Sequence, residues 1–186
     1  MREEILRACF GLFARWGIRR VGVEEIVAGA EVSSGDFHSW VGSKENAAEA
    51  YLQHLYLLWA GAFEAAVAVR GEGPEALLGL FDAVEALCGN EGTGRASLVH
   101  VLAEFGPDDP LGRAAIGLSA LLRSEIARLA HDAGLARSGE FAADCHLLLA
   151  GCILSRAHGS LRAVEDARGI AQALITAHLK AQTLHP

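Results

Sequence analysis

A helical period of about 3.6 residues runs through nearly the whole chain, and this period constrains the fold more than any other feature. Apolar residues recur three or four positions apart in segment after segment, and no segment shows the strict alternation of a half-buried strand. The periodic segments are separated by clusters of glycine and proline, such as residues 71–74 and 106–110. The sequence therefore predicts an all-α protein.

The balance of apolar and charged residues narrows the class of protein further. Of the 186 residues, 52% are hydrophobic, which is ample for a buried core. The net charge of −7 offers no general attraction to nucleic acid or to an anionic membrane, so any contact with DNA must come from a local patch. Apolar runs such as residues 147–154 are too short to span a bilayer, and the first ten residues lack the apolar segment of a secretory signal. We expect a soluble, cytoplasmic protein without a membrane partner.

The four cysteines, Cys9, Cys88, Cys145 and Cys152, lie inside apolar helical patterns. They form no CxxC pair and no His/Cys cluster at the spacing of a zinc site. Free cysteine commonly behaves as a small core hydrophobe. We therefore expect buried, reduced thiols, with no metal and no cofactor.

Residues 18–44 read as two short helices joined by a tight turn. The first helix spans about residues 23–30 and follows Gly22, which offers no side-chain oxygen to the first amides of the helix. The second begins after Ser33, where Ser33 and Asp36 fit a capping box. Such short helices need to be pinned to a core, and the sequence offers Phe37 together with either Trp40 or Val41 for this purpose.

A long helix is predicted from Lys44 to about residue 69. Further helices are predicted over residues 74–87, 94–105, 111–133, 139–158 and 163–183. The last two are apolar on more than one face, so each needs partners on both sides. This pattern indicates a homodimer whose interface these two helices build.

Three stretches carry a family resemblance: ILRACFGLFARWGI from residue 5, VEEIVAGAEVSSGDFHSW from residue 23 and SKENAAEAYL from residue 43. In this order they resemble the head of the TetR family of transcriptional regulators, and the later helices continue the resemblance over the whole chain. The resemblance implies a nine- or ten-helix fold with a helix-turn-helix domain at residues 1–45 and a ligand-binding and dimerisation domain at residues 46–186. It also implies operator DNA and a small, largely apolar ligand as partners.

The chain departs from the family pattern at positions that would meet DNA. Gly22 stands where the family usually has a threonine that caps the second helix and binds a phosphate. Glu31 replaces the glycine of the turn. In the third helix, Asp36 replaces the usual threonine and His38 the phosphate-binding tyrosine, whereas Lys44 keeps the family's phosphate-binding residue. Between residues 18 and 50 three basic residues face six acidic ones, although a surface that neutralises phosphates should lean the other way.

Two interpretations of the third helix therefore stay open. In the first, the helix reads bases in the major groove, with Asp36 accepting from a cytosine amine and His38 facing a phosphate or a guanine edge. In the second, the helix is a structural remnant, Asp36 only caps it, and His38 is a solvated ring. The candidate DNA-binding residues are Ser33, Ser34, Asp36, His38, Ser39 and Lys44.

An all-α body with small residues among large apolar ones can leave a ligand cavity. Each candidate lining residue would serve equally well in plain core packing, because a helical stripe explains an apolar residue without a ligand. The candidates are Trp59, Phe63, Phe81, Glu85, Leu98, Val101, Leu118, Leu122 and His146.

His100 and Glu104 lie four positions apart and so share a helix face. They could bind a metal, act as an acid–base pair on a substrate, or bond each other. The chain has no GxSxG, HExxH, phosphate loop or dinucleotide fingerprint. Our leading hypothesis is a repressor that a ligand releases from its operator. The alternatives are a TetR-like scaffold that has lost DNA binding and binds or transforms a small molecule, with His100 and Glu104 as its first candidates, and a partner-binding adaptor.

Overall fold

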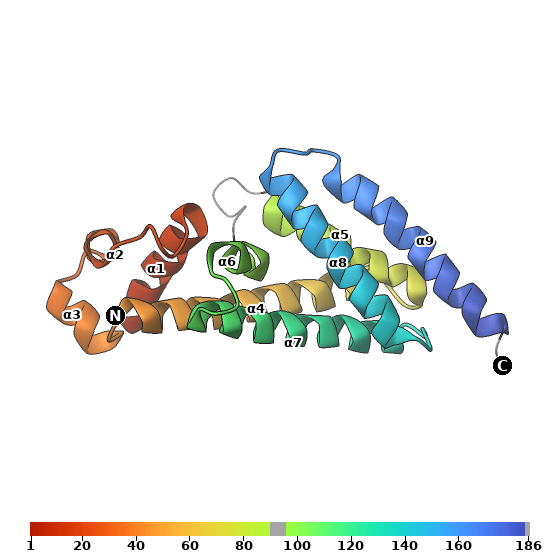
Figure 1. Ribbon diagram of the computed structural model, residues 1–186, viewed down its shortest axis with the longest axis horizontal. Helices are drawn as coiled ribbons and strands as arrows, with labels where there is room; N and C mark the ends of the chain where they lie inside the picture. The colour runs from red at the N-terminus through yellow and green to blue at the C-terminus, as the bar shows by residue number, and fades with distance from the viewer. Residues whose placement is uncertain (90–95, 185–186) are drawn as a thin grey trace. The chain divides into compact units, whose positions relative to one another are not determined.

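The computed structural model describes residues 1–89 and 96–184, with side chains as far as residue 180, and within these residues it contains nine α-helices, one 3-10 helix and no strand. The prediction of an all-α fold is thereby confirmed (Figure 1). The elements are α1 (Arg2–Trp16), α2 (Val23–Ala30), α3 (Ser34–Trp40), α4 (Lys44–Arg70), the 3-10 helix η1 (Pro74–Leu78), α5 (Gly79–Cys88), α6 (Leu98–Glu104), α7 (Pro110–Asp132), α8 (Ser138–Ala157) and α9 (Ala163–Leu184).

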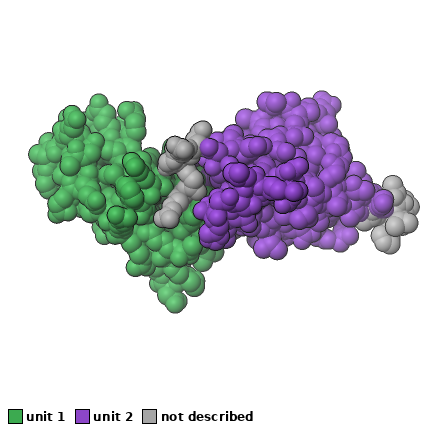
Figure 2. Space-filling model, turned by 90° about the horizontal axis from the view of Figure 1, so that it is seen from above, with its two compact units in different colours: residues 1–57, 90–118 green, residues 58–89, 119–186 purple. Residues whose placement is uncertain are grey.

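The chain forms two compact units, coloured separately in Figure 2. The head unit comprises residues 1–57 and 90–118, and the body unit comprises residues 58–89 and 119–186. Both α4 and α7 begin in the head unit and end in the body unit. This division groups residues by their packing. The boundary expected after residue 45 instead separates a DNA-binding part from a ligand-binding and dimerisation part, and that division stays a proposal.

The core of the head unit is built on one face of α1. Ile5, Cys9 and Phe13 follow one another at intervals of four residues, so they share a face of the helix, and all three are buried. Phe13 meets the ring of Tyr51 from α4 edge-on, with the ring centroids 5.6 Å apart. On α3, Phe37 is likewise fully buried. The short helices thus depend on tertiary packing rather than on their own propensity.

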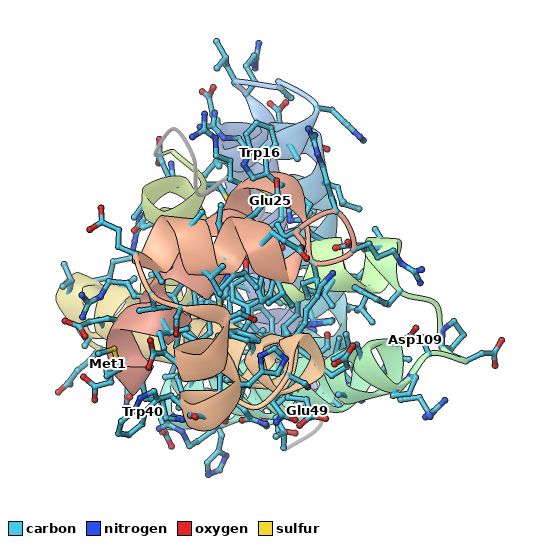
Figure 3. The ribbon with its side chains drawn as sticks, turned by 90° about the vertical axis from the view of Figure 1, so that its left-hand side faces the viewer. Met1, Trp16, Glu25, Trp40, Glu49 and Asp109 are labelled. Atoms are coloured by element: carbon cyan, nitrogen blue, oxygen red, sulfur yellow. The ribbon has the colours of Figure 1, made fainter. Side chains whose placement is uncertain are left out.

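Of the two residues considered for fixing α3 beside Phe37, the structure selects Val41. Phe37 and Val41 are four positions apart and both are buried. Trp40 is 51% exposed, so the expectation that it could pin the helix is wrong. Its indole projects from the head unit instead (Figure 3).

In the body unit, α8 packs against both α5 and α9. Buried Phe81, Phe141, Leu149 and Ile175 come from these three helices. The helix expected over residues 74–87 begins as the 3-10 helix η1, with Pro74 at its first position, and continues as α5. Gly79 opens α5 where a Cβ atom would lie 2.5 Å from the backbone oxygen of Ala66, so α5 and α4 approach too closely there for any side chain.

The cysteines are free thiols. Cys9, Cys145 and Cys152 are buried as expected, whereas Cys88 is only half-buried. Burial raises the pKa of Cys9 to about 11, that of Cys88 to about 11 and that of Cys145 to about 12, and it also raises the pKa of Cys152. Thiols with raised pKa values hold little thiolate at neutral pH and are therefore poor nucleophiles.

Among the described helices, α4 alone is long and apolar enough to cross a membrane when judged by length and composition. Core helices pass the same test. In α4 the side chains of Leu52, Leu55, Trp59 and Phe63 are buried.

Candidate nucleic-acid interface

The start of α2 has the weak cap that the sequence predicts. Gly22 caps the helix without a side chain. The structure adds a compensating bond, in which the Gly22 N–H donates to a carboxylate oxygen of Glu25 at 2.8 Å. Glu25 is three residues into the helix, so this is the acceptor half of a capping box, and its negative charge also suits the positive end of the helix dipole.

Glu31 closes α2 in the left-handed conformation, with φ 55° and ψ 40°. Among the described residues it is the only one other than glycine with a positive φ. The backbone N–H of Val32 donates to the Val27 oxygen at 3.1 Å and completes the end of the helix. An exposed acidic residue thus occupies a backbone conformation that favours glycine.

The turn is followed by a complete capping box at the start of α3. The Asp36 N–H donates to Ser33 Oγ at 3.1 Å, and Ser33 N–H and Oγ–H both donate to Asp36 Oδ2, at 3.2 and 2.6 Å. The bonds from the Ser33 side chain and backbone hold the pKa of Asp36 below its usual range. The predicted box is confirmed, and Asp36 is an ionised cap whatever else it binds.

Polar residues cover the outer side of α3. Ser34, His38 and Ser39 are exposed. His38 Nδ1–H donates to the Ser34 backbone oxygen at 2.7 Å, which fixes the orientation of the ring and makes Nδ1 the protonated nitrogen of the neutral imidazole. A short helix with an exposed polar face that follows a tight turn is the arrangement that base readout in a major groove requires.

Lys44, the first residue of α4, is half-buried and bonded to the turn between α1 and α2. Its Nζ donates to the backbone oxygen of Arg19 at 3.3 Å. The residue that the sequence assigns to a phosphate therefore has an intramolecular acceptor in this structure.

The amides of the α1–α2 turn are held from α6. Glu104, the last residue of that helix, accepts the Ile18 N–H at 3.1 Å and the Arg19 N–H at 2.5 Å, one on each carboxylate oxygen. In return Arg19 Nε–H donates to the Glu104 backbone oxygen at 3.0 Å. The Arg19 guanidinium also lies 4.5 Å from the ring centroid of Phe105 and 3.8 Å from a carboxylate oxygen of Asp109.

The bonds described for His100 and Glu104 go to different partners. His100 Nδ1 lies 2.8 Å from Ser97 Oγ, and Ser97 caps α6. The Glu104 carboxylate binds the turn amides. The pairing of His100 with Glu104, which their spacing on the helix favours, stays a prediction.

A cationic surface feature at the end of α1 was not foreseen. Trp16 lies three residues after Phe13 and fits the apolar stripe of α1 by spacing, yet it is 40% exposed (Figure 3). The guanidinium groups of Arg15 and Arg20 lie 4.8 and 4.7 Å from the centroid of its ring. The signal was present in the sequence as arginines close to a tryptophan. The periodicity of α1 obscured it, because Trp16 fits the apolar stripe by spacing alone.

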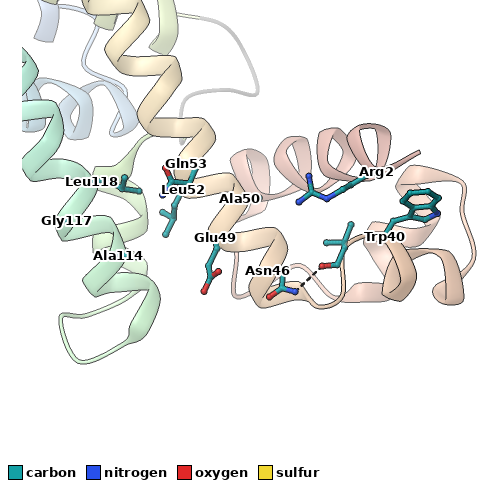
Figure 4. Close-up of a pocket in the computed structure, with 11 residues that line it drawn as sticks. Arg2, Trp40, Asn46, Glu49, Ala50, Leu52, Gln53, Ala114, Gly117 and Leu118 are labelled. Carbon is teal, nitrogen blue, oxygen red and sulfur yellow. Dashed lines mark hydrogen bonds between the residues drawn. The ribbon is translucent and has the colours of Figure 1, made fainter.

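A cavity of about 690 Å³ lies in the head unit (Figure 4). Polar and apolar residues line it together, and the Asn46 side-chain amide donates to the Val41 oxygen at 3.1 Å on its wall. Of the residues expected to line a ligand cavity, Leu118 is found here. The full lining comprises Arg2, Trp40, Val41, Asn46, Glu49, Ala50, Leu52, Gln53, Ala114, Gly117 and Leu118.

The other expected lining residues are divided between the units. Leu98 and Val101 are buried in the head unit, and Phe81 and Leu122 are buried in the body unit. The equally buried Trp59 and Phe63 form an edge-on ring pair in the body unit, with centroids 5.7 Å apart.

The two polar candidates for the cavity behave differently from each other. The expectation that Glu85 lines a ligand cavity is wrong, because its side chain is 62% exposed and bonds Arg168 at 3.2 Å on the surface. His146 is half-buried, and its Nε2 lies 3.0 Å from Ser119 Oγ. Burial, with a smaller contribution from Arg123, lowers the pKa of His146.

Comparison with known proteins places the fold. Neither the family models nor the curated proteins match the sequence. The structure is similar to a TetR-family transcriptional regulator from Streptomyces coelicolor, with a TM-score of 0.78, 17% identity and coverage of 97% of this chain and 94% of that one. It is also similar to a TetR transcriptional regulator from Legionella pneumophila (TM-score 0.79, 17% identity, 93% and 96% covered) and to the reduced form of E. coli NemR (TM-score 0.79, 18% identity, 92% and 95% covered). The likeness spans the whole length at low identity, and the chain therefore has the fold of the TetR-family transcriptional regulators.

Proposed function

We propose that the protein is a cytoplasmic, homodimeric transcriptional repressor that binds operator DNA through α2 and α3 and is released by a small, largely apolar ligand. The observation that carries this proposal is the capped, exposed polar face of α3, which follows a tight turn and precedes Lys44 on a TetR-like fold.

The chemistry of α3 suits base edges better than phosphates. Ser34 and Ser39 offer hydroxyls that can donate or accept, and the His38 ring can meet a guanine edge or a phosphate. Lys44 is the cation at the start of α4, and it would exchange the Arg19 oxygen for a phosphate oxygen. With so few cations on this face, affinity should fall less steeply with salt than for a regulator with many phosphate contacts.

A second copy of the chain is the partner that the outer faces of α8 and α9 fit. These two helices pack on each other, and Leu147 on α8 and Ile170 on α9 are 76% and 54% exposed. Gly151 and Ala173 are also exposed and would let the helices of two copies approach closely. A two-fold dimer would present two α3 helices to half-sites about one DNA turn apart.

Ligand release would act through α4. The helix runs without a break from Lys44 in the head unit to Arg70 in the body unit, and it carries the Trp59–Phe63 pair. A ligand that repacks this pair would shift α4 and so change the spacing of the two α3 helices. The Ser119–His146 pair is the polar group of the body unit that could orient such a ligand.

The second candidate, a scaffold that binds or transforms a small molecule without binding DNA, is favoured by the acidic residues of the head. Glu31 is exposed in the turn, and Asp36 is ionised at the start of α3. Lys44, the residue that the sequence assigns to a phosphate, donates to the backbone oxygen of Arg19. This candidate predicts no complex with DNA at any salt concentration.

Selection from a randomised DNA pool, together with the DNA upstream of the protein's own gene, separates the two candidates. The proposal predicts a saturable, sequence-selective complex that Ser34→Ala and His38→Ala weaken by about tenfold each. Ser124→Ala, which removes an exposed hydroxyl of α7 in the body unit, is the matched control and should bind normally. No enrichment of any sequence at low salt would overturn the proposal in favour of the scaffold.

A further inference from the structure

We propose that Glu104 is a positioning residue for DNA binding, because its carboxylate holds the α1–α2 turn in the arrangement in which α2 and α3 meet DNA. This inference rests on the proposed function and adds to it a residue that touches no base and no phosphate.

The turn needs an outside partner. Ile18 and Arg19 lie between α1 and α2, so their N–H groups have no helical acceptor. The cap of α2 is Gly22, which has no side chain to order the segment. Glu104 satisfies both amides with one carboxylate, and Ile18 itself is buried in the head unit.

The approach of Glu104 depends on a glycine. Gly17 has φ 84°, and a Cβ atom there would lie 3.1 Å from each carboxylate oxygen of Glu104. The positive φ and the close approach both disfavour any other residue. The end of α1 is thus shaped to receive the carboxylate.

Arg19 completes the attachment from the other side. Its Nε donates to the Glu104 backbone oxygen, and its guanidinium covers the Phe105 ring. Its own backbone oxygen accepts Lys44 Nζ. The turn is therefore tied to α6 through its amides and to the first residue of α4 through its carbonyl. When Lys44 turns to a phosphate, the Glu104 bonds and the ion pair between Arg19 and Asp109 are the described polar contacts that still hold the turn.

For the neutralisation of Glu104, a positioning role and simple electrostatics predict opposite changes in DNA affinity. Removing an acidic residue from the head should, by electrostatics alone, leave affinity for DNA unchanged or raise it. If Glu104 positions the turn, its neutralisation should instead weaken binding, because a glutamine has a single acceptor oxygen for two amides.

The experiment compares Glu104→Gln with Asp108→Asn, an exposed acidic residue four positions further along whose side chain has no described partner. Affinity for the DNA sequence selected from the randomised pool is measured by fluorescence anisotropy at about 50 mM salt. We expect Glu104→Gln to lose affinity by about fivefold and Asp108→Asn to keep or gain it. Equal or tighter binding by Glu104→Gln would overturn the inference while leaving the proposed function intact.

Two further measurements test the positioning role of Glu104. Arg19→Lys keeps the positive charge but loses the planar fork, so its affinity should also fall; unchanged affinity would contradict the attachment. Amide hydrogen exchange of the free protein should quicken by about tenfold at Ile18 and Arg19 in Glu104→Gln, and stay unchanged at Val84 in the body unit. Unchanged exchange at the turn would also overturn the inference. Wild-type protein that selects no DNA would overturn the proposed function and the positioning role together.

Discussion

The guanidinium of Arg70 donates two hydrogen bonds to the carboxylate of Asp82, from Nε at 2.5 Å and from Nη2 at 3.0 Å. Arg168 Nη2 adds a third bond at 2.7 Å, so one carboxylate joins the end of α4 to α5 and α9 within the body unit. The bond from Arg70 is the main cause of a lowered pKa at Asp82, which keeps the group ionised through the neutral range.

Asp82→Asn should lower the free energy of unfolding by about 1–2 kcal/mol, because it weakens both arginine contacts of a partly exposed group. A folded pKa below the unfolded one means that the Asp82 contribution is present above the unfolded value and is lost as the pH falls through the folded value. Urea unfolding should therefore show this difference in stability between wild type and variant at neutral pH. The difference should shrink below about pH 4. Glu85→Gln, which removes one exposed contact to Arg168, should cost less than about 0.5 kcal/mol.

Glu31→Gly should stabilise the protein by about 1 kcal/mol, because glycine adopts the left-handed conformation of the α2–α3 turn without steric cost. Glu31→Gln separates the two properties of this residue, since it removes the charge and keeps the strained backbone. We expect thermal unfolding to separate the glycine variant from the glutamine variant, and DNA affinity to rise in both. A glycine variant that is less stable than wild type would show that the Glu31 side chain makes a contact worth more than the strain.

His146 should make the protein less stable in mild acid. Its pKa is lowered by burial, so between the unfolded value of about 6.5 and the folded value the unfolded chain binds more protons, and stability falls with falling pH in that window. His146→Gln should flatten this decline in denaturant midpoint from neutrality down to about pH 5. His158→Gln, which changes an exposed histidine, is the matched control and should leave the decline in place. A wild-type midpoint that does not change over this range would contradict the lowered pKa of His146.

Leu147→Glu should convert the proposed dimer into a monomer in sedimentation, because it places a charge in the middle of the apolar face of α8. Leu161→Glu changes an equally exposed leucine outside α8 and α9 and should leave the dimer intact. Dissociation by both variants, or by neither, would contradict an interface built on these helices.

Local chemistry was readable from the sequence, and long-range chemistry was not. The capping box of Ser33 and Asp36 and the bare cap of Gly22 were predicted because all of their atoms lie within a few residues. The contact between Arg19 and Glu104 joins residues 85 positions apart, and nothing in either segment indicates the other. Spacing alone directed attention to His100 as the partner of Glu104, since neighbours on a helix are the pairs that a sequence displays.

The errors over aromatic and acidic side chains have a shared cause. Trp16 fits the apolar stripe of α1 by spacing, and Trp40 is one of two candidates for fixing α3. Both are exposed near helix ends, where arginines or solvent can contact the indole. Glu85 stood in an apolar helix and was expected to face a cavity, but Arg168 from α9 provides its partner at the surface. In each case the burial or exposure of the side chain depends on neighbours that the fold brings from elsewhere in the chain.

The measurement that tests the central claim most directly is the sequence that the wild-type protein selects from random DNA, followed by titration of that sequence at about 50 and 200 mM salt. We expect a two-fold symmetric site with half-sites centred about one helical turn apart, a stoichiometry of two chains per site, and an affinity that falls with salt by no more than the few phosphate contacts of each head allow. Failure to enrich any sequence at the lower salt concentration would contradict the account and direct the search to small molecules that bind the body unit.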